Sequence, residues 1–319
     1  MRKKLIEITD EQQQAYWLHH FNHHDITADE WDQFTQHQYA QNSLLAMRND
    51  WHLFRQFCQA RNVQALPCAS TAVRLFIQHE AKVRKYATLR RYVLTIGLIH
   101  RILVQKDPTT NVTVKTAISE QRINKHGDAS QAAPFNQHHM VALDHALSAS
   151  EHIRDWRNLA ICYVMFECAL KRSEVRQLTI EQLQPSEYGL ILQLGDQHYR
   201  FSDAAQQALQ KWLAHLPDSH TPLFRAIDRH GNIGSDWMDH SSLYRVIRSV
   251  SEIIGVNVQF SGQSMRVGAV QELAKSGLKV REIQTFGRWL SPAMPYQYVG
   301  NKAAAEAEKM TYVAFKPLE

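Results

Sequence analysis

The chain has 319 residues, enough for two domains with separate cores, and only 12 glycines, about half the usual share, which favours a mainly helical globular protein. It contains neither a run of about 18 apolar residues nor a basic region leading into a long apolar stretch. We therefore expect no membrane span and no secretory leader, and predict a cytoplasmic protein. The formal net charge of +5 and the pI near 9.0 indicate a polyanionic partner.

Residues 1–40 differ from the rest of the chain in charge. They hold three basic and seven acidic side chains, so the other 279 residues carry a net charge of +9. We predict an N-terminal arm over 1–40 that either forms a short helix or stays loosely attached. Four histidines in it have the i, i+4 spacing of helical metal ligands, but no cysteine or third ligand cluster accompanies them, so we predict no metal site. These are His19, His20, His23 and His24.

Apolar side chains recur every three or four residues from Ser43 onward, which predicts a helical domain over 41–123. Its first helix carries Leu44, Met47 and Trp51 on one face. A later helix begins near Thr88 and should end before the Asp107–Pro108 pair, because the residue before a proline disfavours helical geometry.

Between Lys82 and Arg101 the chain has six basic residues and no acidic one. The apolar stripe of the helix faces a core, which leaves basic side chains near the helix start, where free N–H groups also suit phosphates. A solvated charged face is the alternative, and the run alone leaves both open. The candidate phosphate-binding, and hence DNA-binding, residues are Arg84, Lys85, Thr88, Arg90 and Arg91.

Residues 124–135, "NKHGDASQAAPF", are small, polar or turn-forming and predict a linker. In the second domain, 136–319, the segment 156–170 is apolar all round, which predicts a central buried helix whose Cys162 and Cys168 are thiols rather than disulfide partners. Residues 189–195 and 197–201 predict a hairpin that turns at Gly195-Asp196, and helical patterns resume from there to the end.

Four separated motifs of the second domain form an ordered set. They are "LKRSEV" (170–175), the hairpin with His198, "SGQSMRVGA" (261–269) and "GRWLSPAMPYQYVGN" (287–301). In this order and spacing they resemble the tyrosine recombinases, the phage-integrase family, with Trp289 nine residues before Tyr298. The resemblance extends over about 43–302. It implies a mainly α, two-domain architecture: a helical core-binding domain and a mainly helical catalytic domain with a small β-hairpin or sheet, clamping duplex DNA.

The resemblance implies the chemistry as well. Tyr298 would attack a DNA phosphodiester and form a 3′-phosphotyrosyl link, which conserves bond energy, so no metal or nucleotide cofactor is expected. Arg266 would grip the phosphate, Trp289 would assist, and Glu174 would orient a neighbouring base. The implied partners are double-stranded DNA and further copies of the chain, a dimer to tetramer assembled on DNA.

Three catalytic positions depart from the family pattern. Lys171 stands at the first arginine position and keeps the charge without the bidentate fork. His198 stands at the hairpin lysine position, where an imidazole can act as an acid near neutral pH. Gln263 stands where the second motif has histidine, and an amide cannot shuttle a proton. The sequence therefore predicts a slow recombinase, or alternatively a weakened relative that binds DNA as an accessory partner.

Two further points stay open. Tyr296 is a rival nucleophile two residues before Tyr298, although the spacing from Trp289 favours Tyr298. The segment 301–315 has high helix propensity and ends in apolar Tyr312, Val313 and Phe315. By resemblance such a terminal helix docks on a neighbouring copy; it can equally fold back on its own domain.

Overall fold

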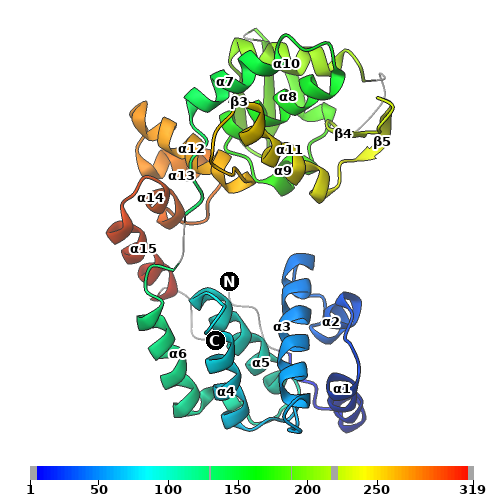
Figure 1. Ribbon diagram of the computed structural model, residues 1–319, viewed down its shortest axis with the longest axis vertical. Helices are drawn as coiled ribbons and strands as arrows, with labels where there is room; N and C mark the ends of the chain where they lie inside the picture. Colours follow the sequence, from blue (N-terminus) through cyan, green and yellow to red (C-terminus); the bar gives the residue numbers. More distant parts are fainter. Residues whose placement is uncertain (1–5, 129–130, 188, 217–221, 315–319) are drawn as a thin grey trace. The chain divides into compact units, whose positions relative to one another are not determined.

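The computed structural model describes residues 6–128, 131–187, 189–216 and 222–314, and it divides into two compact units at about residue 130, inside the segment 124–135 (Figure 1). Both units are mainly helical, and the described strands form two small antiparallel sheets, both in the second unit. The mainly α, two-domain prediction is confirmed. Over the described ranges no helix has both the length and the apolar character needed to cross a membrane.

The first unit consists of helices joined by short turns. They are α1 (Glu11–His23), α2 (Ala28–Phe34), α3 (Gln41–Gln59), α4 (Ser70–Glu80), α5 (Tyr86–Ile102), a 3₁₀ turn (Pro108–Thr110) and α6 (Val112–Asn124). Side chains at the helix starts accept backbone N–H bonds: Asp10 from Gln13, and Thr27 from Glu30. The predicted stripe of α3 is buried at Leu44 and Trp51.

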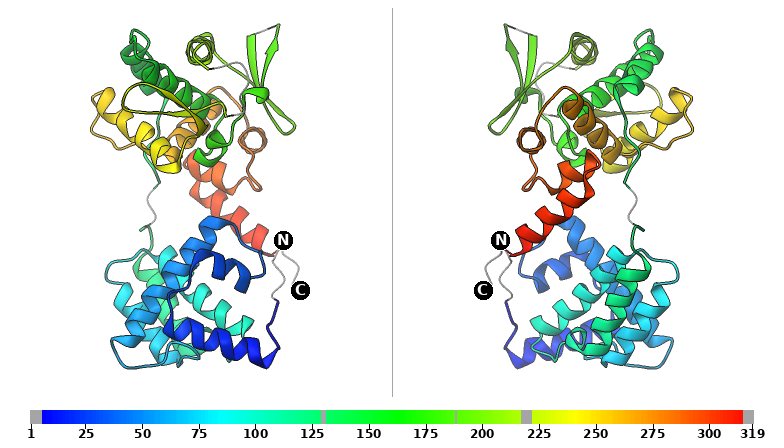
Figure 2. Two further views of the ribbon diagram at one scale, coloured as in Figure 1. Left: turned by 90° about the vertical axis from the view of Figure 1, so that its right-hand side faces the viewer. Right: turned by 90° about the vertical axis from the view of Figure 1, so that its left-hand side faces the viewer.

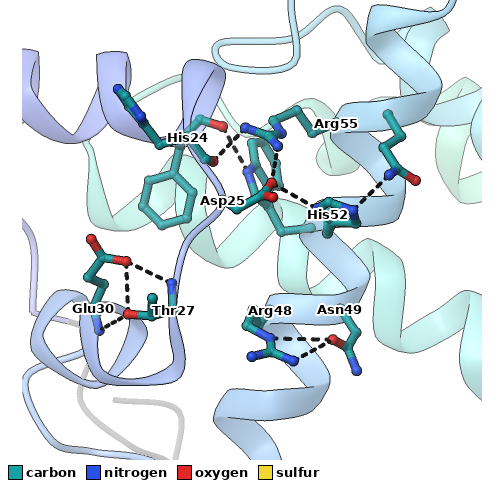
Figure 3. Close-up of polar contacts among 11 residues, drawn as sticks. His24, Asp25, Thr27, Glu30, Arg48, Asn49, His52 and Arg55 are labelled. Atoms are coloured by element: carbon teal, nitrogen blue, oxygen red, sulfur yellow. Dashed lines mark hydrogen bonds and ion pairs between the residues drawn. The ribbon is translucent and has the colours of Figure 1, made fainter.

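Residues 11–34 of the predicted N-terminal arm belong to the core of the first unit rather than to a loosely attached segment. Phe21, Trp31 and Phe34 are buried, and the Trp51 indole of α3 donates to the Phe21 carbonyl at 3.0 Å. Hydrogen bonds and an ion pair between the segment after α1 and helix α3 reinforce this contact (Figure 3). Asp25 forms an ion pair with Arg55 of α3 and accepts a 3.1 Å bond from His52, while Arg55 donates to the His24 carbonyl.

The second unit surrounds one buried helix. Its elements are α7 (Gln137–Leu147), α8 (Ile153–Glu167), α9 (Arg172–Arg176), a 3₁₀ turn (Ile180–Gln182), β1 (Leu183–Ser186), β2 (Gly189–Leu194), β3 (Gln197–Arg200), α10 (Asp203–Leu213), β4 (Arg225–Ile227), β5 (Ile233–Trp237), α11 (His240–Ile253), α12 (Gly262–Lys275), α13 (Val280–Phe286), α14 (Ala293–Tyr298) and α15 (Lys302–Ala314). Helix α8 is buried from Leu159 to Phe166 and packs against α7, α10 and α12. The central helix predicted over 156–170 is confirmed, and all four cysteines are free.

The three-stranded sheet lies at the edge of the second unit (Figure 2). Strand β2 pairs with both β1 and β3, and Leu194 faces Gln197, so the predicted turn at Gly195-Asp196 is confirmed. The strand at 183–186 was not predicted.

A second hairpin, β4–β5, occupies a region for which helical patterns were predicted, and that prediction is wrong there. The turn of this hairpin is set locally: the Asp228 carboxylate accepts backbone bonds from His230 and Asn232, and Gly231 adopts a φ of 91°. The strands are short and irregularly paired between Arg225 and Ile227. Such short strands carry too few residues for an alternating pattern to stand out.

Candidate active site

The motif "SGQSMRVGA" forms the start of α12, and three of its small residues have a structural reason. Ser261 caps the helix by accepting from the Ser264 N–H. Gly268 lies where residue 135 crosses the helix: a Cβ there would be 1.5 Å from the Phe135 carbonyl oxygen. The crossing is fixed by a 3.0 Å bond from the Phe135 N–H to the Ser264 carbonyl. The motif therefore combines a helix cap, a close backbone crossing and the arginine between them.

Arg266 is the buried cation of this site, with 5% of its surface exposed. Its Nη2 donates to the Gly287 carbonyl at 2.9 Å, and the guanidinium lies over the Trp289 ring, 4.2 Å from the centroid. Within the described residues Nη1 has no hydrogen-bond partner; the Glu174 Oε2 is 3.6 Å away. Burial lowers the pKa of Arg266, opposed by the Glu174 carboxylate, yet a guanidinium stays protonated at any physiological pH. Arg266 is therefore a buried positive charge, and its Nη1 is a hydrogen-bond donor without a partner among the described residues.

Glu174 links the first motif to this cation. Its carboxylate accepts from the Lys171 N–H at 2.6 Å, which caps the short helix α9, and lies 3.4 Å from the Lys171 Nζ. Arg288 Nη2 donates to it at 3.1 Å. Burial alone would raise the pKa of Glu174, but the bonds from Arg288 and from the Lys171 N–H outweigh it, so this pKa lies below its ordinary value and the carboxylate is charged.

Tyr298 is the last residue of α14. Two glutamines of α12 bind it, one at its side-chain hydroxyl and one at its backbone carbonyl. The Gln263 Nε2 donates to the Tyr298 Oη at 3.3 Å, and the Gln271 Nε2 donates to the Tyr298 carbonyl at 3.0 Å. The Tyr298 ring is buried and packs edge-to-face against the Trp289 ring, with 5.9 Å between the ring centroids. It belongs to a small core that also includes Val267, Val270 and Ile283. The rival Tyr296 makes none of these contacts in the described part of the chain.

The structure brings Lys171, Glu174, Gln263, Arg266, Trp289 and Tyr298 together, but not His198. Neighbouring residues on a strand point to opposite faces. Tyr199 faces inward, is buried and donates to the Phe286 carbonyl at 2.5 Å, whereas His198 is exposed. No hydrogen bond or ring contact joins His198 to the other site residues in the described ranges.

Arg288 belongs to the cluster and was missed by the sequence reasoning. It bonds Glu174, lies over the Tyr199 ring and adopts a positive φ of 56°. A single arginine before a tryptophan forms no pattern of its own, and its partner Glu174 is 114 residues away. The side chain could have been suspected only from its place beside Trp289.

In the first unit, the predicted phosphate-binding residues differ in their surroundings. Arg91 forms two 2.8 Å bonds with the buried Asp50 carboxylate, and Arg84 forms an ion pair with Glu80 at 3.2 Å. Arg90 lies exposed on α5, and Thr88 is half-buried. The described residues contain no group of three or more His, Cys, Asp or Glu able to hold a metal ion.

No family model matches the chain. Two relatives cover most of it. An integrase/recombinase XerD homolog from Selenomonas ruminantium is 25% identical over 279 residues, which covers 82% of each chain. The recombinase Cre from Escherichia phage P1 is 20% identical over 296 residues, covering 84% of this chain and 85% of its own. The chain is therefore similar to tyrosine recombinases over most of its length.

The fold of the chain is also that of solved tyrosine recombinases. The XerH site-specific recombinase bound to palindromic difH substrate, a post-cleavage complex, superposes with a TM-score of 0.65, covering 98% of this chain and 91% of its own at 13% identity. At that identity the likeness concerns the fold. The tyrosine recombinase resemblance predicted from the motifs is thus confirmed, and Cre is among the relatives.

Proposed function

We propose that the chain is a site-specific recombinase that cuts and rejoins duplex DNA through a 3′-phosphotyrosyl intermediate on Tyr298. One observation carries this proposal: the buried guanidinium of Arg266, whose Nη1 lacks a partner among the described residues, lies in the same cluster as the Tyr298 hydroxyl. A buried guanidinium nitrogen without a hydrogen-bond partner in the described ranges, close to a tyrosine hydroxyl, suits a phosphate more than it suits packing, because an unsatisfied buried donor is costly.

In the proposed step the Tyr298 Oη attacks phosphorus and loses its proton to water, and the bond from phosphorus to the 5′-oxygen breaks. The 5′-oxygen leaves as a hydroxyl after taking up a proton, and the reverse attack by a 5′-hydroxyl of a second duplex rejoins the strand. Arg266 and Lys171 stabilise the charge on the non-bridging oxygens. The Trp289 ring packs against one face of the Arg266 guanidinium and fixes its orientation. Glu174 orients these cations.

Binding of double-stranded DNA is supported by the relatives and by the charge of the chain. The XerH structure contains its difH DNA, and 279 residues of this chain carry a net charge of +9. A palindromic substrate such as that of XerH matches a symmetric pair of copies. We therefore include assembly of a dimer to tetramer on DNA in the proposal.

A slow reaction is part of the same proposal. Lys171 offers a point charge instead of a fork, Gln263 cannot accept the Tyr298 proton, and the exposed His198 must approach from the hairpin to act as an acid. These three features also favour the second candidate, a DNA-binding accessory relative with little or no strand transfer.

The test is covalent capture. A duplex selected for binding from a randomised pool is synthesised with a nick near the cleavage point, so that the departing strand diffuses away and the adduct accumulates. We expect a protein–DNA adduct that survives denaturation, is lost in Tyr298→Phe and is retained in the matched control Tyr296→Phe. If a duplex that binds tightly yields no adduct, the accessory function replaces the enzyme.

A further inference from the structure

Arg288 lies in the turn between α13 and α14, and its side chain is fully engaged in hydrogen bonds. Nε and Nη2 donate to the two oxygens of Glu174 at 3.5 and 3.1 Å. Nη1 donates to the Tyr199 hydroxyl and to the Phe286 carbonyl. Because each nitrogen of the guanidinium already faces a protein acceptor, Arg288 is poorly suited to bind a phosphate itself.

Arg288 lies in the turn that ends α13. Its φ of 56° is left-handed, and the Trp289 N–H donates to the Gln284 carbonyl at 3.0 Å, which is a common way for a helix to end. The residues on either side also contact the site: the Gly287 carbonyl accepts from Arg266 Nη2, and the Trp289 ring packs against the Arg266 guanidinium. Residues 287–289 thus hold both the cation and the carboxylate beside it.

Glu174 is the one carboxylate described in contact with this cluster, and three cations surround it. Arg288 is the nearest side-chain donor, at 3.1 Å, while Lys171 Nζ and Arg266 Nη1 lie at 3.4 and 3.6 Å. A shift of a few tenths of an ångström would bring Arg266 Nη1 into a direct hydrogen bond with Glu174. That bond would tie Nη1 to the carboxylate and leave less of its donor capacity for a substrate.

We propose that Arg288 is a positioning residue that occupies the Glu174 carboxylate and thereby keeps the Arg266 guanidinium available for the scissile phosphate. This proposal rests on the proposed function and adds a requirement to it. Both oxygens of the Glu174 carboxylate must be hydrogen-bonded by a cation that does not itself contact DNA. Lys171 cannot saturate it alone, because an ammonium lacks the two-pronged geometry with which Arg288 meets both oxygens.

The decisive variant is Arg288→Gly, because glycine tolerates the left-handed φ, so the whole side chain is removed without straining the backbone. With DNA saturating, we expect single-turnover adduct formation on the nicked duplex to slow at least tenfold. DNA affinity, measured in a Tyr298→Phe background, should change less than twofold. Arg281→Ala, which removes an exposed arginine of α13, is the control for loss of a positive charge and should react at nearly the wild-type rate.

A second variant tests whether Arg288 positions the Arg266 guanidinium or only stabilises the turn between α13 and α14. Glu174→Gln keeps an oxygen to cap α9 but removes the negative charge that would capture Arg266. The double variant Arg288→Gly/Glu174→Gln should therefore react at least threefold faster than Arg288→Gly alone. The proposal is overturned if Arg288→Gly reacts within twofold of wild type, or if the double variant is no faster than Arg288→Gly. Absence of an adduct with the wild-type protein instead counts against the proposed function.

Discussion

Gln263 donates a hydrogen bond to the hydroxyl that must lose its proton in the proposed reaction. An amide can hold the Tyr298 oxygen in place, but it cannot take the proton away. The proton must therefore pass to water or to another group, which is a physical reason for a slow reaction. The position of Gln263 at the exposed start of α12 leaves room for an imidazole.

We predict that Gln263→His accelerates cleavage. A positioned proton acceptor contributes roughly 10²–10⁴-fold in enzymes, and because the site has not been built around an imidazole we expect about tenfold. The measurement is single-turnover adduct formation on the nicked duplex between pH 6 and 8, with the gain vanishing at the acid end as the imidazole protonates. Gln263→Leu, which lacks any polar group, is the control and should slow the reaction. An unchanged rate in Gln263→His would mean that proton removal is not limiting.

At the scale of secondary-structure elements, α5 shows that a basic helix face has two kinds of residue. Arg91 binds Asp50, which is buried on α3 and also accepts a 3.1 Å bond from Thr95. Arg90 on the same helix is exposed. A structural arginine and a candidate DNA-binding arginine are thus neighbours, and their loss should have different consequences.

We predict that Arg91→Ala destabilises the first unit by about 1–3 kcal/mol, because it leaves a buried carboxylate short of its partner. Arg90→Ala should leave stability unchanged and flatten the salt dependence of DNA binding. Denaturant unfolding and binding titrations at several salt concentrations measure the two effects. Equal stability of both variants would contradict the distinction.

The pH dependence follows from the sign of the Asp50 shift. Burial raises the pKa of Asp50, opposed by Arg91, so the folded chain holds this proton more tightly than the unfolded chain does. Stability from this group therefore declines as the pH rises through the raised pKa. Loss of Arg91 removes the opposing effect, and the destabilisation should be smaller at pH 5 than at pH 7.5.

How far the sequence predicts these elements depends on how local their causes are. These elements were predictable where a short continuous segment contains the whole pattern, as in the apolar stripes of α3 and α5 and the Gly195-Asp196 turn. Helices α1 and α2 were harder because glutamine, histidine and acidic residues dilute their few aromatic anchors, although Trp17 and Phe21 keep the i, i+4 spacing. At the site, the residues predicted from three of the four motifs lie together, but His198 of the hairpin lies apart from them, and Arg288 depends on contacts from distant parts of the chain.

At the scale of the whole molecule, Tyr298 and Arg266 pack against the same tryptophan, Trp289, of their own chain. Gln263 and Gln271, two turns apart on α12, hold Tyr298, and Trp289 lies between its ring and Arg266. Such a site is complete within one copy, even if several copies assemble on DNA.

We therefore predict cleavage in cis. Mixing Tyr298→Phe with Arg266→Ala protein on the nicked duplex should form no more adduct than Arg266→Ala alone, because neither copy contains both groups. A site shared between copies would instead regain activity in the mixture, since the tyrosine of one variant would reach the arginine of the other. Adduct yield against the ratio of the two proteins is the measurement, with each variant mixed with wild type as the positive control.

The crossing of Phe135 over α12 has a consequence for recognising distant relatives. By the resemblance, Lys171 and Gln263 stand where the family pattern has other catalytic side chains, so we expect the chemistry of such a site to vary more than its fold. Gly268 has no such freedom, since any larger residue would strike the Phe135 backbone whether or not the protein cuts DNA. A glycine two residues after the motif arginine is thus a better fingerprint of this architecture than the catalytic side chains, and it should identify members of the family whose activity has faded.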